Sequence, residues 1–247
     1  MEHKDLFSGH AKLYSVFRPT YPVELYDFIF KHVNQFDNAW DCGTGNGQVA
    51  SVLAQHFNHV DATDLSSKQL EQAPALLNVT YTTTPAEQTS LPNQHFDLIT
   101  VAQALHWIEL EKFYAEVKRV AKPGALLAVW GYSVLSINEE MDSHLLHFYK
   151  DIVGPYWDQA RRLVDEEYKT VSFPFEEIQS QQFYIKVEWD LAHLAGYLET
   201  WSSTQKYISV HGKNPVTELI GIFKKYWGDE TKARTISFPI FLRLGRL

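Results

Sequence analysis

The chain has 247 residues, of which 45% are apolar and 14% aromatic, so it can bury a large core and is not expected to be disordered. Its net charge of -8, without any run of Lys or Arg, argues against a protein whose main task is to grip nucleic-acid phosphates. Cys42 is the only cysteine, so no intramolecular disulfide can form. With no apolar leader and no apolar stretch of about 18 residues, we expect a soluble cytoplasmic protein with neither a nucleic-acid nor a membrane partner.

The first part of the chain, residues 1–35, has two amphipathic helical patterns. They are separated by a segment with two prolines, Arg18-Pro19-Thr20-Tyr21-Pro22. Because proline disfavours the helical conformation in the residue before it, we predict a helical cap that is broken at this segment.

Residues 36–130 alternate between strand and helix patterns. We predict a short strand before a glycine-rich loop, further strands at 59–63, 79–82, 96–101 and 126–130, and helices at 48–57, 66–74 and 109–121. This alternation predicts right-handed βαβ units and a parallel sheet, which is an α/β fold.

After Trp130 the pattern changes. Residues 131–180 are helical, irregular and rich in aromatic side chains, and we interpret them as an insertion that forms a lid over the ligand edge of the sheet. The rest of the chain predicts a strand at 183–189, helices at 192–202 and 215–226, and a last strand at 235–244. Pro239 interrupts that strand, which indicates a sheet edge or a bulge.

The segment from Trp40 to Gly47 contains three glycines at alternate positions, followed by a predicted helix. Glycines allow positive φ angles and close approach of a ligand, and a helix N-terminus attracts an anion. A dinucleotide-binding fold needs a third glycine one residue later, where this chain has Gln48, so an NAD(P)-dependent oxidoreductase is the alternative enzyme class. Asp41 is predicted either to accept hydrogen bonds from an ammonium group or to orient the loop.

Asp64 follows Gly43 by 21 residues and ends the second predicted strand. At this place in a doubly wound sheet a carboxylate meets the ribose hydroxyls of a nucleotide-like ligand. The alternative is that Asp64 only caps the helix that begins near Ser66.

Several further motifs occur in a fixed order. They are Ala86-Glu87 with Leu91-Pro92 and Phe96-Asp97, the turn Arg119-Val120-Ala121-Lys122-Pro123-Gly124, the segment Val101 to Trp107, the segment Tyr14 to Pro22, and Trp201-Ser202-Ser203. With these motifs the chain resembles the class I S-adenosylmethionine-dependent methyltransferases, in the branch that contains trans-aconitate methyltransferase and related small-molecule enzymes. The resemblance covers residues 10–130 well and the remainder loosely.

The resemblance implies a Rossmann-like doubly wound, mostly parallel sheet of seven strands, the last ones antiparallel, with helices on both faces. We expect one domain of residues 1–247, with a helical cap (1–35), a cofactor-binding core (36–130), a lid insertion (131–180) and C-terminal elements that complete the sheet (181–247). The implied contacts with S-adenosylmethionine come from Tyr14, Arg18, Asp41, Gly43, Thr44, Gly45, Asp64, Leu65, Ala86, Glu87, Gln103 and Ala104.

The predicted methyl acceptor is a small molecule, with a carboxylate as one option. A carboxylate needs no general base, whereas a neutral hydroxyl or amine benefits from one. His106 is the candidate base, with a place in the pocket wall as its alternative role. The other predicted acceptor contacts are aromatic: Trp107, Trp130, Tyr132, Trp157 and Trp201.

Other interpretations stay open beside this one. A non-catalytic module of the same fold would bind the cofactor without methyl transfer. Two pairs of histidines, His56/His59 and His144/His147, have spacing suitable for a metal but lack a third ligand, so we predict no metal site. Cys42 has no adjacent base and suits a tight turn better than nucleophilic catalysis. We expect a monomer or a weak homodimer.

Overall fold

The computed structural model describes residues 17–247, so the predicted helical pattern around Tyr14 lies outside the described residues. The strands are β1 (Asn38–Cys42), β2 (His59–Asp64), β3 (Val79–Thr83), β4 (Phe96–Ala102), β5 (Ala121–Tyr132), β6 (Glu176–Ile178), β7 (Phe183–Trp189) and β8 (Arg234–Arg246). The helices are α2 (Val23–Phe30), α3 (Gln48–Leu53), α4 (Ser67–Leu70), α5 (Leu110–Val120), α6 (Glu139–His147), α7 (Arg161–Asp165), α8 (Leu191–Glu199), α9 (Ser202–His211) and α10 (Val216–Trp227), with short helical turns η1 (Leu105–Trp107), η2 (Phe148–Ile152) and η3 (Gly154–Tyr156).

These strands form one sheet in the order β3-β2-β1-β4-β5-β8-β6, and β7 also pairs with β8. Strands β1 to β5 are parallel, as the alternating pattern predicts, and β8 is antiparallel to β5, β6 and β7. The sheet has eight strands rather than the predicted seven. The additional strand is β6, whose three residues are too few for a recognisable sequence pattern.

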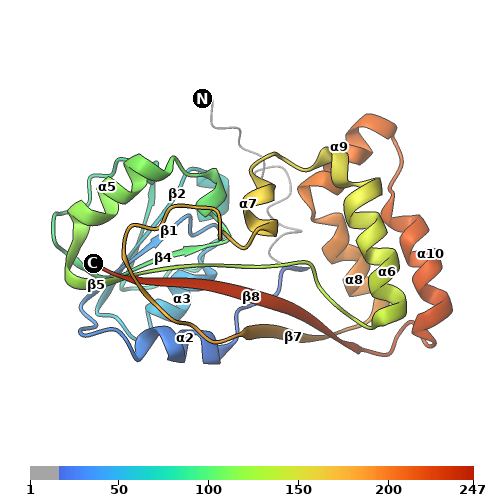
Figure 1. Cartoon of the computed structure of the whole chain (residues 1–247), viewed down its shortest axis with the longest axis horizontal. Helices are drawn as coiled ribbons and strands as arrows, with labels where there is room; N and C mark the ends of the chain where they lie inside the picture. Colours follow the sequence, from blue (N-terminus) through green and yellow to red (C-terminus); the bar gives the residue numbers. More distant parts are fainter. Residues whose placement is uncertain (1–16) are drawn as a thin grey trace.

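Two layers of apolar side chains cover the two faces of the sheet. Alternate residues of β5 enter opposite layers, since successive strand side chains point to opposite faces. One layer includes α2 and α3, and the other includes α5. Figure 1 shows α6, α8, α9 and α10 gathered beyond one end of the sheet, with α7 between them and the core.

Several predicted boundaries change. α3 ends at Leu53 instead of residue 57, α4 has four residues, and β5 begins at Ala121 rather than residue 126. The expectation that Pro239 marks an edge is wrong, because β8 lies between β5 and β7. Pro239 immediately precedes Ile240, the first β8 residue that pairs with β5, and its carbonyl accepts a hydrogen bond from the Ser133 N–H. Its missing N–H therefore removes no bond inside that ladder.

The strand order changes direction between β1 and β4, which are neighbours although β2 and β3 lie between them in the sequence. In an open α/β sheet, the carboxyl ends of the strands at such a point form the ligand-binding crevice. The glycine-rich loop follows β1 and residues 103–107 follow β4, so the topology brings these two segments to one edge.

Candidate active site

The loop after β1 lies directly against the loop after β4. Gly43, Gly45 and Gly47 have φ values of +69°, +57° and +79°, which favour glycine. A Cβ atom on Gly43 would lie 2.6 Å from Cβ of Ala104, whereas a Cβ on Gly45 would have no atom within 4 Å. The chain therefore needs glycine at position 43 for close packing, and it leaves open space in front of position 45.

Asp41 is buried beneath this loop. Its Oδ2 accepts hydrogen bonds from Thr44 Oγ1 (2.5 Å) and Ala50 N (3.1 Å), and its Oδ1 accepts one from Thr100 Oγ1 (2.8 Å). Burial raises the pKa of this carboxyl to about 6, although the hydrogen bonds act in the opposite direction. These contacts favour the second of the two predicted roles, in which Asp41 orients the loop and the start of α3.

Asp64 connects the loop to the next strand end. Its Oδ2 accepts a hydrogen bond from Gly45 N (2.9 Å), and its Oδ1 accepts one from Ser66 N (2.8 Å). Ser66 rather than Asp64 caps α4, because the Ser66 hydroxyl accepts a hydrogen bond from Gln69 N (3.4 Å). The Asp64 carboxylate instead connects the glycine loop to the turn before that helix, beside the open space at Gly45. Leu65 follows with a side chain that is 48% exposed, which leaves an apolar surface available next to that carboxylate.

The residues after β3 close another side of the same edge. Ala86 is buried, and Glu87 Oε1 accepts a hydrogen bond from Glu109 N (2.8 Å). This contact joins the segment that carries Ala86 and Glu87 to the start of α5.

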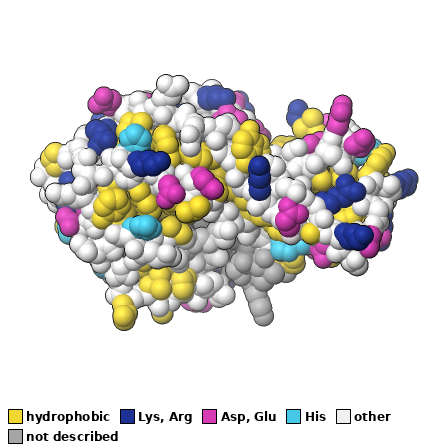
Figure 2. All heavy atoms as spheres, turned by 90° about the horizontal axis from the view of Figure 1, so that it is seen from below, with side chains coloured by type: hydrophobic (Ala, Val, Ile, Leu, Met, Phe, Trp, Pro, Cys, Tyr) yellow, Lys and Arg dark blue, Asp and Glu magenta, His cyan; other side chains and the backbone are white. Residues whose placement is uncertain are grey.

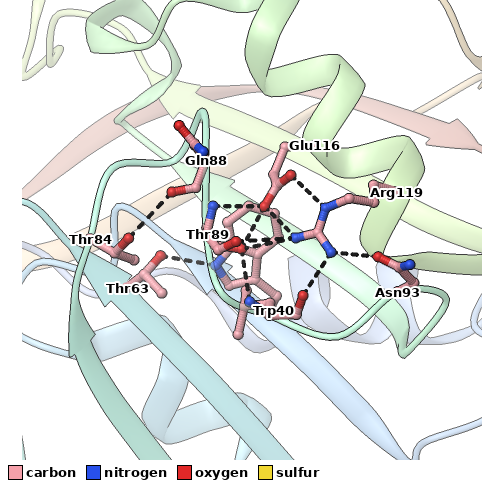
Figure 3. Close-up of polar contacts among 9 residues, drawn as sticks. Trp40, Thr63, Thr84, Gln88, Thr89, Asn93, Glu116 and Arg119 are labelled. Carbon is pink, nitrogen blue, oxygen red and sulfur yellow. Dashed lines mark hydrogen bonds and ion pairs between the residues drawn. The ribbon is translucent and has the colours of Figure 1, made fainter.

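A polar network holds the end of that segment against α5 (Figure 3). Glu116 accepts hydrogen bonds from Thr89 N (2.8 Å) and Thr89 Oγ1 (2.6 Å), and Arg119 pairs with Glu116 (2.6 Å). Arg119 also donates to the carbonyl of Leu91 (2.8 Å) and to Asn93 Oδ1 (2.6 Å). The network explains in physical terms why the motif around Leu91 and the later Arg119 occur together.

Gln103 has a left-handed backbone, with φ +53°, at the end of β4. Its N–H donates to the Trp130 carbonyl (2.9 Å), and its Nε2 donates to the Tyr132 carbonyl (3.3 Å). Its Oε1 is buried and has no hydrogen-bond partner. A strained backbone and an orphaned acceptor at a strand end are typical of a ligand-binding position.

His106 lies in η1 and is partly buried. Its Nδ1 is 2.9 Å from Tyr168 Oη. Burial, followed by the positive charge of Arg161, lowers the pKa of His106 to about 3, so its imidazole is neutral near pH 7. Burial also raises the pKa of the Tyr168 hydroxyl, which is therefore protonated.

The aromatic residues predicted to contact an acceptor fall into two groups. Trp130 is fully buried, with its ring against those of Tyr21 (5.5 Å) and Tyr26 (6.3 Å), so it belongs to the core instead of a pocket wall. Tyr132, on the same side of β5, accepts a hydrogen bond from Arg18 Nη1 (2.7 Å).

The second group lies in the helices beyond the sheet. The ring of Trp157 is 5.6 Å from that of Trp201 and 5.3 Å from that of Tyr149, and Tyr197 is 5.9 Å from Trp201. The guanidinium of Arg161 lies over the Trp157 ring at 4.9 Å. Sequence reasoning missed Arg161, Tyr149 and Tyr197, although an arginine in the aromatic-rich stretch 149–168 was a usable signal.

The comparisons with known proteins agree with this geometry. Residues 40–129 match the family model described as a methyltransferase domain. A proposed methyltransferase of Dictyostelium discoideum is 34% identical over 98% of this chain and 95% of its own length. The chain is a class I S-adenosylmethionine-dependent methyltransferase.

Solved structures support the methyltransferase fold. A proposed type II methyltransferase of Anaeromyxobacter dehalogenans has a TM-score of 0.87 at 34% identity, over 94% of this chain and 98% of that one. A proposed methyltransferase of Bacillus halodurans has a TM-score of 0.52 at 18% identity, over 91% and 99% of the two chains, and shows the fold alone.

The edge of the sheet fits S-adenosylmethionine, the cofactor of this family. Gly45 faces open space beside the Asp64 carboxylate, and the orphaned Oε1 of Gln103 is an acceptor next to the packed pair Gly43 and Ala104. Apolar, acidic and acceptor groups of this kind match the adenine, ribose and sulfonium portions of that molecule.

Proposed function

We propose that this methyltransferase acts on a small organic acid and forms a methyl ester at a carboxylate oxygen. The observation that carries the proposal is the neutral His106 beside Arg161, at the end of β4. A site that has a neutral imidazole of low pKa and a neighbouring cation is poorly suited to removing a proton from a hydroxyl or an amine. A carboxylate, by contrast, arrives already ionised and is attracted by the cation.

The cofactor contacts are those that the family resemblance implies, and we propose them for this chain. Asp64 holds the ribose hydroxyls, Gly43, Thr44 and Gly45 line the methionine portion, and Asp41 acts through the loop. Leu65, Ala86 and Glu87 border the adenine, Gln103 and Ala104 lie under the sulfonium, and Arg18 faces the cofactor carboxylate. Tyr14 lies outside the described residues.

Bound S-adenosylmethionine supplies an activated methyl group, and the acceptor oxygen gains the methyl as the bond to sulfur breaks, so no proton is transferred. The protein contributes position and exclusion of water. The packed loops at Gly43 and Ala104 fix the donor side, while the aromatic side chains of the helices beyond the sheet surround the acceptor.

Ester formation has a chemical signature that tests the proposal. The protein is incubated with methyl-labelled S-adenosylmethionine and a panel of mono- and dicarboxylic acids, amines and phenols. We expect label only in products that release methanol in mild alkali, because methyl esters hydrolyse there and N-methyl or ether products do not. Transfer to a base-stable product contradicts the carboxylate proposal while leaving the methyltransferase assignment intact.

We propose a small molecule rather than a nucleic acid as the partner of this chain. On the face in Figure 2, Lys and Arg side chains of the described residues are scattered among Asp and Glu, which supports a compact acceptor over a nucleic acid. None of the helices described between residues 17 and 247 has the length and apolar character that a membrane crossing requires. A monomer or weak homodimer and a cytoplasmic location are proposed on the sequence alone.

A further inference from the structure

Tyr168 has a strained backbone that holds its side chain against the turn after β4. It follows Glu167, and the two residues have left-handed φ values of +54° and +55°. Such values are rare for a bulky side chain and persist only where the surrounding structure imposes them. The Tyr168 side chain is fully buried, and its ring meets that of Phe241 edge-on at 5.1 Å. The fold therefore fixes this side chain in spite of the strain.

Hydrogen bonds on both sides of Tyr168 impose this backbone conformation. The Tyr168 N–H donates to the Leu163 carbonyl (2.8 Å). Arg243 Nη1 donates to the carbonyls of Tyr168 (3.0 Å) and Val171 (2.7 Å). Arg243 is held in turn by Glu177, whose Oε1 lies 2.8 Å from its Nε. These contacts restrict the direction in which the phenol points.

The Tyr168 hydroxyl contacts both the backbone and the imidazole of η1. Its oxygen lies 2.9 Å from His106 Nδ1. The backbone N–H groups of Leu105 and His106 also act on this oxygen, where they oppose the rise in the pKa of the phenol. They are the first N–H groups of a helical turn, which find no acceptor inside the turn. The phenol oxygen is therefore an acceptor for the backbone of η1.

The direction of the hydrogen bond between Tyr168 and His106 follows from this arrangement. A phenol has one proton to donate, and its oxygen lone pairs accept. Since backbone N–H groups face those lone pairs, the hydroxyl proton is left for His106 Nδ1. A neutral imidazole that accepts at Nδ1 carries its own proton on Nε2.

We propose that Tyr168 is a positioning residue that fixes His106 with its proton on Nε2, and that this N–H donates a hydrogen bond to an oxygen of the methyl acceptor. The turn η1 begins directly after Gln103 and Ala104, at the edge of the sheet that carries the site. In the part of the chain that the structure describes, His106 Nε2 has no hydrogen-bond partner, and His106 is only partly buried. The inference rests on the proposed function, which supplies the acceptor oxygen.

This assignment separates the two roles predicted for His106. A protonated Nε2 has no lone pair with which to remove a proton from the acceptor, so His106 is not a general base. A donor to a carboxylate oxygen does more than form the pocket wall, because it binds the acceptor. Methylation removes the negative charge of that carboxylate, so the hydrogen bond is no stronger in the transition state, and its loss should raise KM more than it lowers kcat.

The first test observes the two ring nitrogens of His106. The full chain, ¹⁵N-labelled in its histidine rings and loaded with S-adenosylhomocysteine, is studied by NMR near pH 7, and the His106 signals are those missing from His106→Gln. A protonated and an unprotonated ring nitrogen differ widely in chemical shift, and an unprotonated nitrogen moves upfield when it accepts a hydrogen bond. We expect a protonated Nε2 and an unprotonated, upfield-shifted Nδ1.

Tyr168→Phe should move the Nδ1 signal downfield, to the position of an unpaired ring nitrogen. The matched control is Tyr114→Phe. Tyr114 is also buried, in the same apolar layer, but its hydroxyl donates to the Ser172 carbonyl (2.8 Å). This control removes a buried hydroxyl of the same kind and should leave both His106 signals in place.

The second test measures methyl transfer to the acid of the panel above that is esterified fastest. His106→Leu should raise KM for that acid about tenfold and change kcat by less than about threefold, because it removes one hydrogen bond to a charged group. His106→Gln keeps an N–H donor of similar reach and should raise KM by about threefold or less. Affinity for S-adenosylhomocysteine should be the same in both variants.

A proton on Nδ1, or an Nδ1 signal that stays in place in Tyr168→Phe, overturns the positioning role. If Tyr168→Phe does not fold, the Nδ1 shift of the unmodified chain gives the answer, since an unpaired position contradicts the hydrogen bond. A fall in kcat of about 100-fold at unchanged KM in His106→Leu, or equal KM values for His106→Leu and His106→Gln, overturns the donor role. Transfer to base-stable products instead contradicts the proposed function and leaves the NMR result unchanged.

Discussion

Replacing Gly43 with alanine tests whether the two loops at the switch point are packed as tightly as the structure shows. Alanine at φ +69° costs about 1–2 kcal/mol, because its Cβ crowds the backbone in the left-handed region. The added Cβ would also lie 2.6 Å from Cβ of Ala104, more than about 1 Å inside normal carbon contact. Such overpacking adds about 1–3 kcal/mol, so Gly43→Ala should lower the free energy of unfolding by about 2–5 kcal/mol in total.

Two other variants separate these contributions. Gly212→Ala, at the end of α9, has φ +65° and no atom within 4 Å of the new Cβ, so it should lose only the backbone part, about 1–2 kcal/mol. Combining Gly43→Ala with Ala104→Gly removes the contact and should be less destabilising than the sum of the two single changes. Urea unfolding measures the unmodified chain, the three single variants and the double variant, and calorimetry measures their S-adenosylhomocysteine affinity. Equal losses at positions 43 and 212, together with additive energies in the double variant, would refute the packing argument.

Three further predictions concern charge and pH. The pKa of His106 is lowered from 6.5 to about 3 in the folded chain, so the unfolded chain takes up the proton first and the folded chain loses stability as pH falls below 6.5. His106→Gln lacks this loss. Between pH 8 and pH 5, its free energy of unfolding should therefore rise by about 2 kcal/mol relative to that of the unmodified chain, as measured by urea unfolding. Asp41 has the opposite sign, because its pKa is raised from 3.8 to about 6 and the folded chain holds the proton more tightly. Relative to Asp41→Asn, the unmodified chain should lose about 2.4 kcal/mol of stability between pH 4 and pH 7.5. An unchanged difference contradicts the assigned burial. Arg119→Met removes the charged partner of Glu116, which then keeps only the hydrogen bonds from Thr89. It should cost about 1–3 kcal/mol, since the arginine is partly exposed, and weaken S-adenosylhomocysteine binding. Arg119→Met/Glu116→Met should restore part of the stability; no restoration would mean that the network in Figure 3 is not the cause.

The predicted location of the methyl-donor site depends on residues that lie close to one another in the sequence. A strand, a glycine turn and the acid that ends the next strand follow each other within 21 residues from Gly43 to Asp64, and parallel pairing of β1 with β2 brings them together. The same applies to the alternation that predicts the parallel sheet. Sequence alone was therefore enough for the fold class, because short-range patterns and the rule for βαβ units determine where these strand ends meet. The family followed from the resemblance of the motifs to a known family.

The position of β8 and the protonation state of His106 depend on tertiary structure. The interior position of β8 in the sheet depends on its pairing with β5 and β7, which are distant in the sequence. A proline in β8 therefore does not show whether a neighbouring strand extends alongside it. Likewise, the neutral state of His106 follows from burial and from Arg161, 55 residues later. Burial and charge contacts between distant segments have no local pattern. The sequence could therefore predict a methyl-donor site, but not the burial of His106 or the nearby charge of Arg161.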